Sequence, residues 1–185
     1  MRQTNLPYEN LRIFLRHNKF KKIFILTGKN SFYKSSADKI LEKTLIKQNK
    51  KIFFKKSLFP EIKELKIIIK NIRDYKPDLI IAIGGGSVMD YAKIANVKNI
   101  ETKLKTNITL GNNKLKDNYT TLIAIPTTAG SGSEVTSNAV IYIRNTKYSV
   151  EGNHLIPNYY YLMPELVIGN KKTIKSSSGF DAISQ

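Results

Sequence analysis

The sequence predicts an α/β fold in which a parallel sheet is covered by helices on both faces. Short apolar runs alternate three times with segments of helical periodicity, and the connections between them are short. Residues 78–83 (DLIIAI) are continuously apolar, which is typical of a strand buried on both faces of a sheet. Glycine-containing segments follow two of the expected strands, at the edge where such sheets bind their ligands.

The individual elements follow from hydrophobic periodicity and from turn residues. The strands are expected at residues 21–27, 51–54, 78–83 and 120–125, and the helices at residues 35–48, 60–74 and 87–97. Ser35 or Ser36 could cap the first helix. Pro60 lies near the first turn of the second helix, where a missing N–H costs little.

The pattern changes in the last part of the chain. The lysine- and asparagine-containing segment 103–118 is predicted to be a polar loop. A strand pair is expected at residues 139–144 and 147–151, and the tail to Gln185 is expected to be irregular.

Composition excludes several classes of protein. The chain has 185 residues, of which 41% are hydrophobic, so it can bury a core and is not disordered throughout. It has no cysteine, which excludes disulfide frameworks, cysteine-based metal sites and cysteine nucleophiles. Its two histidines, His17 and His154, are too few for a histidine-rich metal site. Without a long apolar run or a signal-peptide pattern, we expect a cytoplasmic protein with no membrane segment.

The net charge of +17 raises the alternative of a non-catalytic α/β domain that binds nucleotides or nucleic acid. Residues 43–56 combine several lysines with Phe53 and Phe54, as a nucleic-acid surface would. Elsewhere the lysines are dispersed, and arginine, which is favoured for base reading and bidentate phosphate contacts, is scarce. Dispersed lysine is more simply explained as a solvated surface, and this argues against nucleic acid as the partner.

The strongest local signal is the segment IGGGSVMD at residues 83–90. Its three glycines connect a buried strand to a helix, so backbone N–H groups and the positive end of the helix dipole could together bind an anion such as pyrophosphate. The segment is neither a P-loop nor a GxGxxG fingerprint, and without a ligand it also fits a tight strand–helix turn.

A second signal, PTTAGSGSEVT at residues 126–136, follows the next strand. It combines small residues with hydroxyl groups that can donate to phosphate or ribose oxygens, and a helix is expected to begin after it. Alone it could be a polar loop with a helix cap. Beside the glycine segment, it predicts a ligand crevice at the carboxyl ends of two neighbouring strands.

These motifs closely resemble the iron-containing alcohol dehydrogenase family. The matching stretches are GGGSVMDYAKIA at residues 84–95, IPTTAGSGSEVTSNAVI at residues 125–141 and GFDAISQ at residues 179–185. The resemblance implies a Rossmann-like, NAD(P)-binding domain followed by an all-helical, metal-binding domain. It also implies hydride transfer between NAD or NADP and a small-molecule alcohol or aldehyde whose oxygen lies on Fe²⁺ or Zn²⁺.

The resemblance further implies roles for individual residues in cofactor binding. They are Gly85, Gly86, Ser87 and Asp90 for the pyrophosphate loop, Thr127, Thr128 and Ser131 for the adenine, ribose and phosphate side, and Thr136, Asn138 and Lys147 toward the nicotinamide ribose. On the same basis Asp181 would be the first metal ligand. Four residues later, where the family often has a histidine, this chain has Gln185, whose amide oxygen is a poor ligand for a transition metal.

The family's later metal-binding histidines and its helical domain do not follow. We therefore expect residues 1–175 to form the cofactor-binding domain, and residues 176–185 to be the first part of a truncated helical domain. Such a chain would bind cofactor without turnover and could self-associate, for example as a homodimer. The absence of an acidic residue at the end of the second strand, where Lys55 and Lys56 stand, predicts that NADP is tolerated or preferred.

Overall fold

The computed structural model describes residues 4–5, 8–45, 48–110 and 117–184. Within these residues, parallel strands form a six-stranded sheet in the order β1-β8-β5-β4-β2-β3, and β6 and β7 form a separate antiparallel hairpin. The strands are β1 (Thr4–Asn5), β2 (Lys22–Gly28), β3 (Asn49–Lys55), β4 (Leu79–Gly84), β5 (Thr121–Pro126), β6 (Asn138–Ile143), β7 (Thr146–Glu151) and β8 (Tyr159–Tyr160). The α/β fold predicted from the sequence is confirmed.

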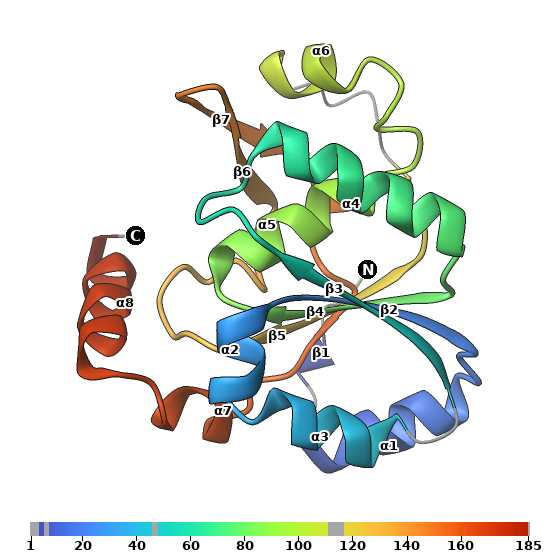
Figure 1. Cartoon of the computed structure of the whole chain (residues 1–185), viewed down its shortest axis with the longest axis vertical. Helices are drawn as coiled ribbons and strands as arrows, with labels where there is room; N and C mark the ends of the chain where they lie inside the picture. The colour runs from blue at the N-terminus through green and yellow to red at the C-terminus, as the bar shows by residue number, and fades with distance from the viewer. Residues whose placement is uncertain (1–3, 6–7, 46–47, 111–116, 185) are drawn as a thin grey trace.

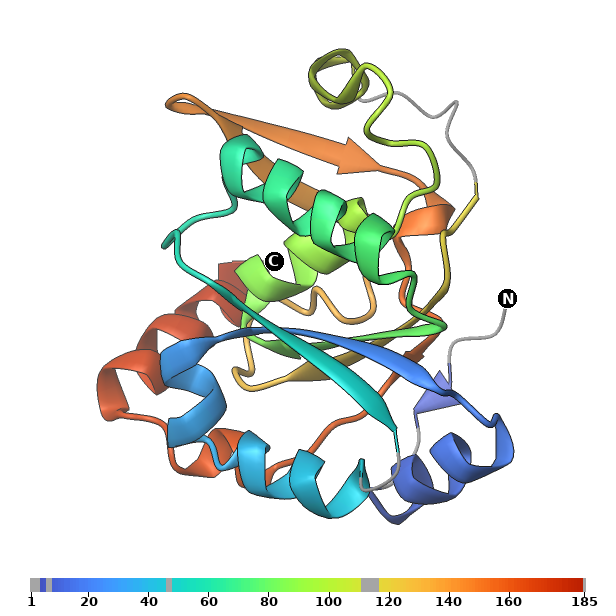
Figure 2. The ribbon, with the colours of Figure 1, turned by 45° about the vertical axis from the view of Figure 1, so that its right-hand side comes forward.

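Helices cover both faces of the sheet (Figures 1 and 2). The described helices are α1 (Tyr8–His17), α2 (Lys29–Lys34), α3 (Ala37–Thr44), α4 (Ile62–Tyr75), α5 (Gly86–Ala95), α6 (Leu104–Thr109), α7 (Glu165–Ile168) and α8 (Lys172–Ser184), with a short 3₁₀ turn at Asn153–Leu155. One hydrophobic core lies between the sheet and α4, α5, α6 and the hairpin. The other lies between the opposite face and α1, α2, α3 and α7. None of the described helices has the length and apolarity needed to cross a bilayer.

The buried strands and helices follow from their sequence periodicity. Every residue of β4 is buried, as its continuous apolar run predicts for a central strand of a parallel sheet. In α4 the buried side chains recur at helical spacing, at Leu65, Ile68, Ile69 and Ile72, and together they cover the sheet.

The helix predicted at residues 35–48 is wrong in its extent. Within that range the described residues form one helix, α3, from Ala37 to Thr44, and the short helix α2 precedes it. Ser36 lies between the two helices with a φ of 62°, a left-handed conformation that a continuous helix cannot contain. Ser36 is the N-cap residue of α3, but its side chain makes no capping hydrogen bond.

Two segments predicted to lack regular structure contain helices. The polar loop at 103–118 includes α6, whose Leu104 and Ile108 are buried at helical spacing. The tail includes α7 and α8, and α8 runs through a series of serines. Serine costs only about 0.5 kcal/mol relative to alanine within a helix, so a serine run does not by itself end one.

The helix expected after Thr136 is also wrong. The chain instead enters β6, in which buried and exposed residues alternate with the period of two that a strand requires. The hairpin itself is confirmed, with Arg144 and Asn145 between its strands.

Candidate functional site

Two loops meet at the carboxyl edge of the sheet, one after β4 and one after β5. These strands are neighbours, and Gly84 pairs with Pro126 in their register. Immediately beyond that pair, the backbone N–H of Thr127 donates to the carbonyl of Gly84 at 2.9 Å. The two segments that are predicted to line a ligand crevice, 84–90 and 127–136, therefore lie side by side.

Gly84 makes the turn from β4 into α5 possible. Its φ of 156° is rarely adopted by residues with a side chain, and a Cβ there would lie 2.6 Å from Cγ2 of Val88. Gly85 is the N-cap residue of α5, so the first N–H groups of the helix lie at the same edge of the sheet.

Gly85 and Gly86 allow the two loops to approach each other. A Cβ at Gly85 would lie 3.2 Å from Oγ1 of Thr128, and a Cβ at Gly86 would lie 2.9 Å from Oγ of Ser131. A larger residue at position 86 would therefore displace Ser131 with or without a bound cofactor. Loss of cofactor affinity in such a variant would not by itself show that pyrophosphate lies against Gly86.

Asp90 and the buried Lys93 join α5 to the second loop. Oγ of Ser133 donates to Oδ1 of Asp90 at 3.0 Å and accepts from Nζ of Lys93 at 3.3 Å. Burial raises the pKa of Asp90 to about 6, although Lys93, Ser133, the backbone of Val140 and Lys147 all favour its charged form. Burial lowers the pKa of Lys93 to about 8, against the attraction of Asp90 and Glu134.

The residues predicted to lie toward the nicotinamide belong to the same region. Nζ of Lys93 donates to Oγ1 of Thr136 at 3.0 Å and to the carbonyl oxygen of Asn138 at 2.7 Å. Lys147, on the neighbouring strand of the hairpin, is exposed and close enough to Asp90 to affect its pKa. Ser87 is half-buried in the first turn of α5.

Sequence reasoning missed Lys93 and Ser133. Lys93 lies three residues after Asp90 in a helix whose other residues are mostly apolar or small, and this spacing places both on one helical face. A lysine in such a helix is the signal that could have identified it. Ser133 offered no signal beyond its membership of a hydroxyl-rich loop.

A cavity of about 560 Å³ opens beside the second loop. Thr128, Gly130 and Gly132 line it on the loop side. The remaining lining residues are mostly apolar and are Pro126, Ala129, Glu134, Leu162, Met163, Pro164, Val167, Ile168 and Ala182. Helix α8 approaches the loop closely here, because a Cβ on Gly130 would lie 2.7 Å from the carbonyl oxygen of Ser178.

The motifs around this edge match a known family. The sequence model of iron-containing alcohol dehydrogenase matches residues 7–164, which is most of the chain. The chain belongs to the iron-containing alcohol dehydrogenase family. The resemblance stated from the two glycine-containing segments is confirmed.

This chain aligns with only part of the length of its individual relatives. The 4-hydroxybutyrate dehydrogenase of Clostridium kluyveri is 36% identical over 129 residues, which cover 67% of this chain and 33% of that protein. An alcohol dehydrogenase of Thermococcus barophilus is 32% identical over 130 residues, covering 67% of this chain and 34% of its own length. The chain thus aligns with about a third of each.

Solved structures of the family show the same fold. An iron-containing alcohol dehydrogenase from Thermotoga maritima superimposes with a TM-score of 0.82 at 26% identity, covering 98% of this chain and 51% of that one. The sulfoacetaldehyde reductase of Bifidobacterium kashiwanohense, solved in complex with NAD⁺, superimposes with a TM-score of 0.83 at 22% identity. It covers 98% of this chain and 51% of that one.

The residues described here do not form the metal site that the family name implies. Asp181 is exposed on α8, and among the described residues no three histidine, aspartate or glutamate side chains are grouped so as to hold a metal ion. A catalytic zinc site uses about three protein ligands and an open position, which Asp181 alone cannot provide. Gln185, at the position where a second ligand was considered, lies outside the described residues.

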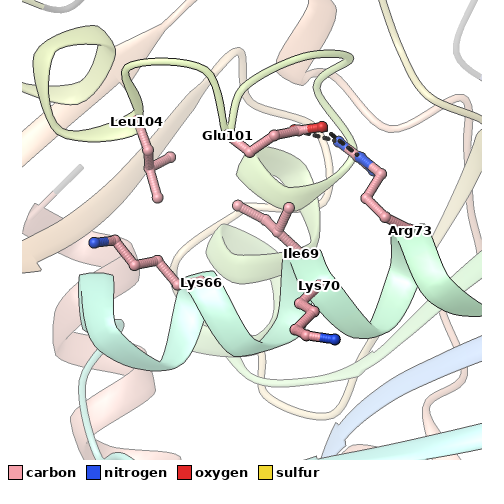
Figure 3. Close-up of a pocket in the computed structure, with 6 residues that line it drawn as sticks. All are labelled: Lys66, Ile69, Lys70, Arg73, Glu101 and Leu104. Atoms are coloured by element: carbon pink, nitrogen blue, oxygen red, sulfur yellow. Dashed lines mark hydrogen bonds and ion pairs between the residues drawn. The ribbon is translucent and has the colours of Figure 1, made fainter.

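A second cavity, of about 470 Å³, lies between α4 and the α6 segment (Figure 3). Its most distinctive side chain, Arg73, is fully engaged in structure. The guanidinium pairs with Glu101 at 3.2 Å, donates to the carbonyl of Val97 at 2.8 Å and lies 4.1 Å from the ring centroid of Tyr119. These contacts hold the segment that follows α5 in place. They give Arg73 a structural role, and nothing about them indicates catalysis.

Proposed function

We propose that this chain binds NAD(H) or NADP(H) in the crevice between the β4–α5 turn and the loop 127–136. The observation that carries the proposal is the direct pairing of the two loops through the Thr127–Gly84 hydrogen bond. This contact lies at the carboxyl ends of adjacent parallel strands, where open α/β sheets bind ligands. The N-terminus of α5 supplies the positive end for a pyrophosphate.

The remaining predicted cofactor residues would lie along the same crevice. Thr128 lines the 560 Å³ cavity, whose mostly apolar walls suit an adenine ring, while Ser131 lies against Gly86 beside the helix terminus. At the other end, Thr136 and Asn138 accept hydrogen bonds from Lys93, and Lys147 lies near Asp90. These three residues would lie toward the nicotinamide ribose.

The reaction to which this site would contribute is hydride transfer between the cofactor and an alcohol or aldehyde. We propose that the chain supplies the cofactor part of that reaction and does not turn over by itself. The support is chemical, because Asp181 belongs to no group of three or more histidine, aspartate or glutamate side chains that could hold a metal ion among the described residues. As parts of the same proposal, the chain acts in the cytoplasm, and residues 1–175 form its cofactor domain.

The binding proposal can be tested without the ambiguity of a bulky residue at Gly86. In Ser87→Asp the new carboxylate lies in the first turn of α5. There it interacts favourably with the helix dipole, but it repels a pyrophosphate. We expect NADH and NADPH affinity to fall at least about tenfold while the melting temperature is kept or raised. Because the chain has no tryptophan, nicotinamide fluorescence can be followed directly.

The matched control is Thr106→Asp, which adds the same charge on α6. We expect it to leave both affinities unchanged. Equal affinity in the wild type and Ser87→Asp would overturn the assignment of the pyrophosphate to α5. Absence of any dinucleotide binding by the wild-type chain would overturn the proposed function as a whole.

A further inference from the structure

Lys93 is a buried lysine whose ammonium group is fully used. Its side chain is 1% exposed, and Nζ donates to Oγ of Ser133 at 3.3 Å, Oγ1 of Thr136 at 3.0 Å and the carbonyl oxygen of Asn138 at 2.7 Å. A protonated lysine has three N–H donors, so each one has an acceptor.

All three acceptors belong to one continuous segment, residues 133–138, which joins the hydroxyl-rich loop to β6. Lys93 lies two turns along α5 from Gly86 and therefore holds the C-terminal end of the loop. Gly85 and Gly86 accommodate its N-terminal part. The loop is therefore fixed to α5 at both ends, beside the proposed cofactor site.

Asp90 completes the arrangement as the opposite charge. It lies one turn before Lys93 on α5 and accepts a hydrogen bond from Ser133, the residue that also accepts from Lys93. A buried charge is costly unless it is paired and hydrogen-bonded, and a buried ion pair adds little net stability over an apolar contact of the same volume. Stability alone is thus a weak explanation for a lysine here, and fixing one loop geometry is a stronger one.

We propose that Lys93 is a positioning residue for the nicotinamide half of the cofactor site. By holding residues 133–138 against α5, it places Thr136 and the start of β6 next to Asp90. This inference rests on the proposed cofactor binding, and it assigns Lys93 a role through its neighbours rather than through contact with the reacting atoms.

A role at the nicotinamide half of the site should affect binding of whole NADH and spare binding of its adenine portion. ADP contains the adenosine and pyrophosphate portions of NADH but lacks the nicotinamide and the ribose attached to it. The variant Lys93→Met removes the ammonium group and keeps an unbranched apolar side chain in the buried position. We expect it to weaken NADH binding at least about tenfold, as loss of charged hydrogen bonds at a buried site does, and to change ADP binding less than about twofold.

The matched control is Lys63→Met, which makes the same substitution at an exposed position of α4 and should change neither affinity. Ser133→Ala provides a second test that keeps both charges and removes only the hydroxyl between them. It should lower NADH affinity in the same selective way, so the inference remains testable if Lys93→Met does not fold.

Bound NADH also gives a spectroscopic signature, because the intensity and wavelength of its emission depend on the surroundings of the nicotinamide ring. We expect both variants to lose the wild-type emission change at saturating NADH. Equal losses of NADH and ADP affinity, or no loss of either, would overturn the positioning role while leaving cofactor binding intact. Failure of the wild type to bind either probe would overturn both the inference and the proposed function.

Discussion

The two loops at the β4–β5 edge and the helix α8 lie at the same edge of the sheet but differ in how they are held (Figures 1 and 2). The loops are fixed by backbone pairing at Gly84, by close packing at Gly86 and by the Asp90–Ser133–Lys93 network. In α8 no residue is buried, and Phe180 and Ile183 are 73% and 83% exposed.

This difference separates the two halves of the family's chemistry. The proposed cofactor half uses the ends of buried parallel strands, whose positions are set by the core of this chain. Asp181, the metal ligand that the family resemblance implies, stands on a helix with no buried residue. The proposed cofactor residues are therefore held by packing within this chain, whereas Asp181 is not.

The largest effect should come from the same substitution made in each region. Gly84→Ala places a Cβ against Val88 in a backbone conformation unfavourable for alanine, and we expect it to lower the free energy of unfolding by roughly 2–4 kcal/mol. Gly179→Ala in α8 meets no atom within 4 Å and should raise it by up to about 1 kcal/mol, because alanine favours a helix. Urea denaturation measures the free energy of unfolding of both variants. Similar changes in the two would show that the regions do not differ in how tightly they are held.

A second test uses the pH dependence of stability. The pKa of Asp90 is raised from 3.8 to about 6, so between these pH values the folded state binds more protons than the unfolded state. Stability should therefore fall as the pH rises through this window. Asp90→Asn should remove that fall, whereas Asp181→Asn should leave it unchanged. Urea denaturation at several pH values measures the slope, and an unchanged slope in Asp90→Asn would count against the buried environment of this carboxyl.

The sequence predicted the parts of the molecule that local patterns determine. The continuous apolar run of β4, the helical spacing in α4 and the glycine segment before α5 each specify their element directly. The short helix α2 and the bounds of α3 were not predicted, and the helix expected after Thr136 is wrong. The boundary between α2 and α3 depends on one left-handed serine, and the chain after Thr136 enters a hairpin that packs against α5; adjacent residues reveal neither.

The candidate site shows the same division. The glycines and hydroxyls could be assigned from their motifs, but the role of Lys93 depends on acceptors 40 to 45 residues away in sequence. Contacts between residues so far apart in sequence depend on the order of strands in the sheet, and that order cannot be read from a single sequence. Residues that act across the fold are therefore the ones that motif reasoning misses.

Cofactor preference should show a smaller effect. Nζ of Lys55 donates to the carbonyls of Ser57 and Leu58, which leaves the exposed Lys56 as the lysine available to a 2′-phosphate. We expect Lys56→Ala to reduce NADPH affinity by about two- to fivefold, as for an exposed ion pair, and to leave NADH affinity unchanged. Competitive titration measures both. A wild-type chain that binds NADH tenfold or more tightly than NADPH would contradict the predicted tolerance of NADP.

The smallest effect, on the melting temperature, is expected from added metal ions. It tests whether α8 and its Asp181 form part of a metal site. Because Asp181 belongs to no group of three or more possible metal ligands among the described residues, added Zn²⁺ or Fe²⁺ should not raise the melting temperature, since a ligand stabilises a protein only to the extent that it binds the folded state. Asp181→Ala should behave like the wild type in the same titration. Cofactor binding, by contrast, should raise the melting temperature of both chains equally, because α5 and its loops are intact in each. A metal-dependent increase in melting temperature that disappears in Asp181→Ala, or metal-dependent reduction of a simple aldehyde by the purified chain, would show that α8 belongs to a working metal site and would remove the distinction between the two regions.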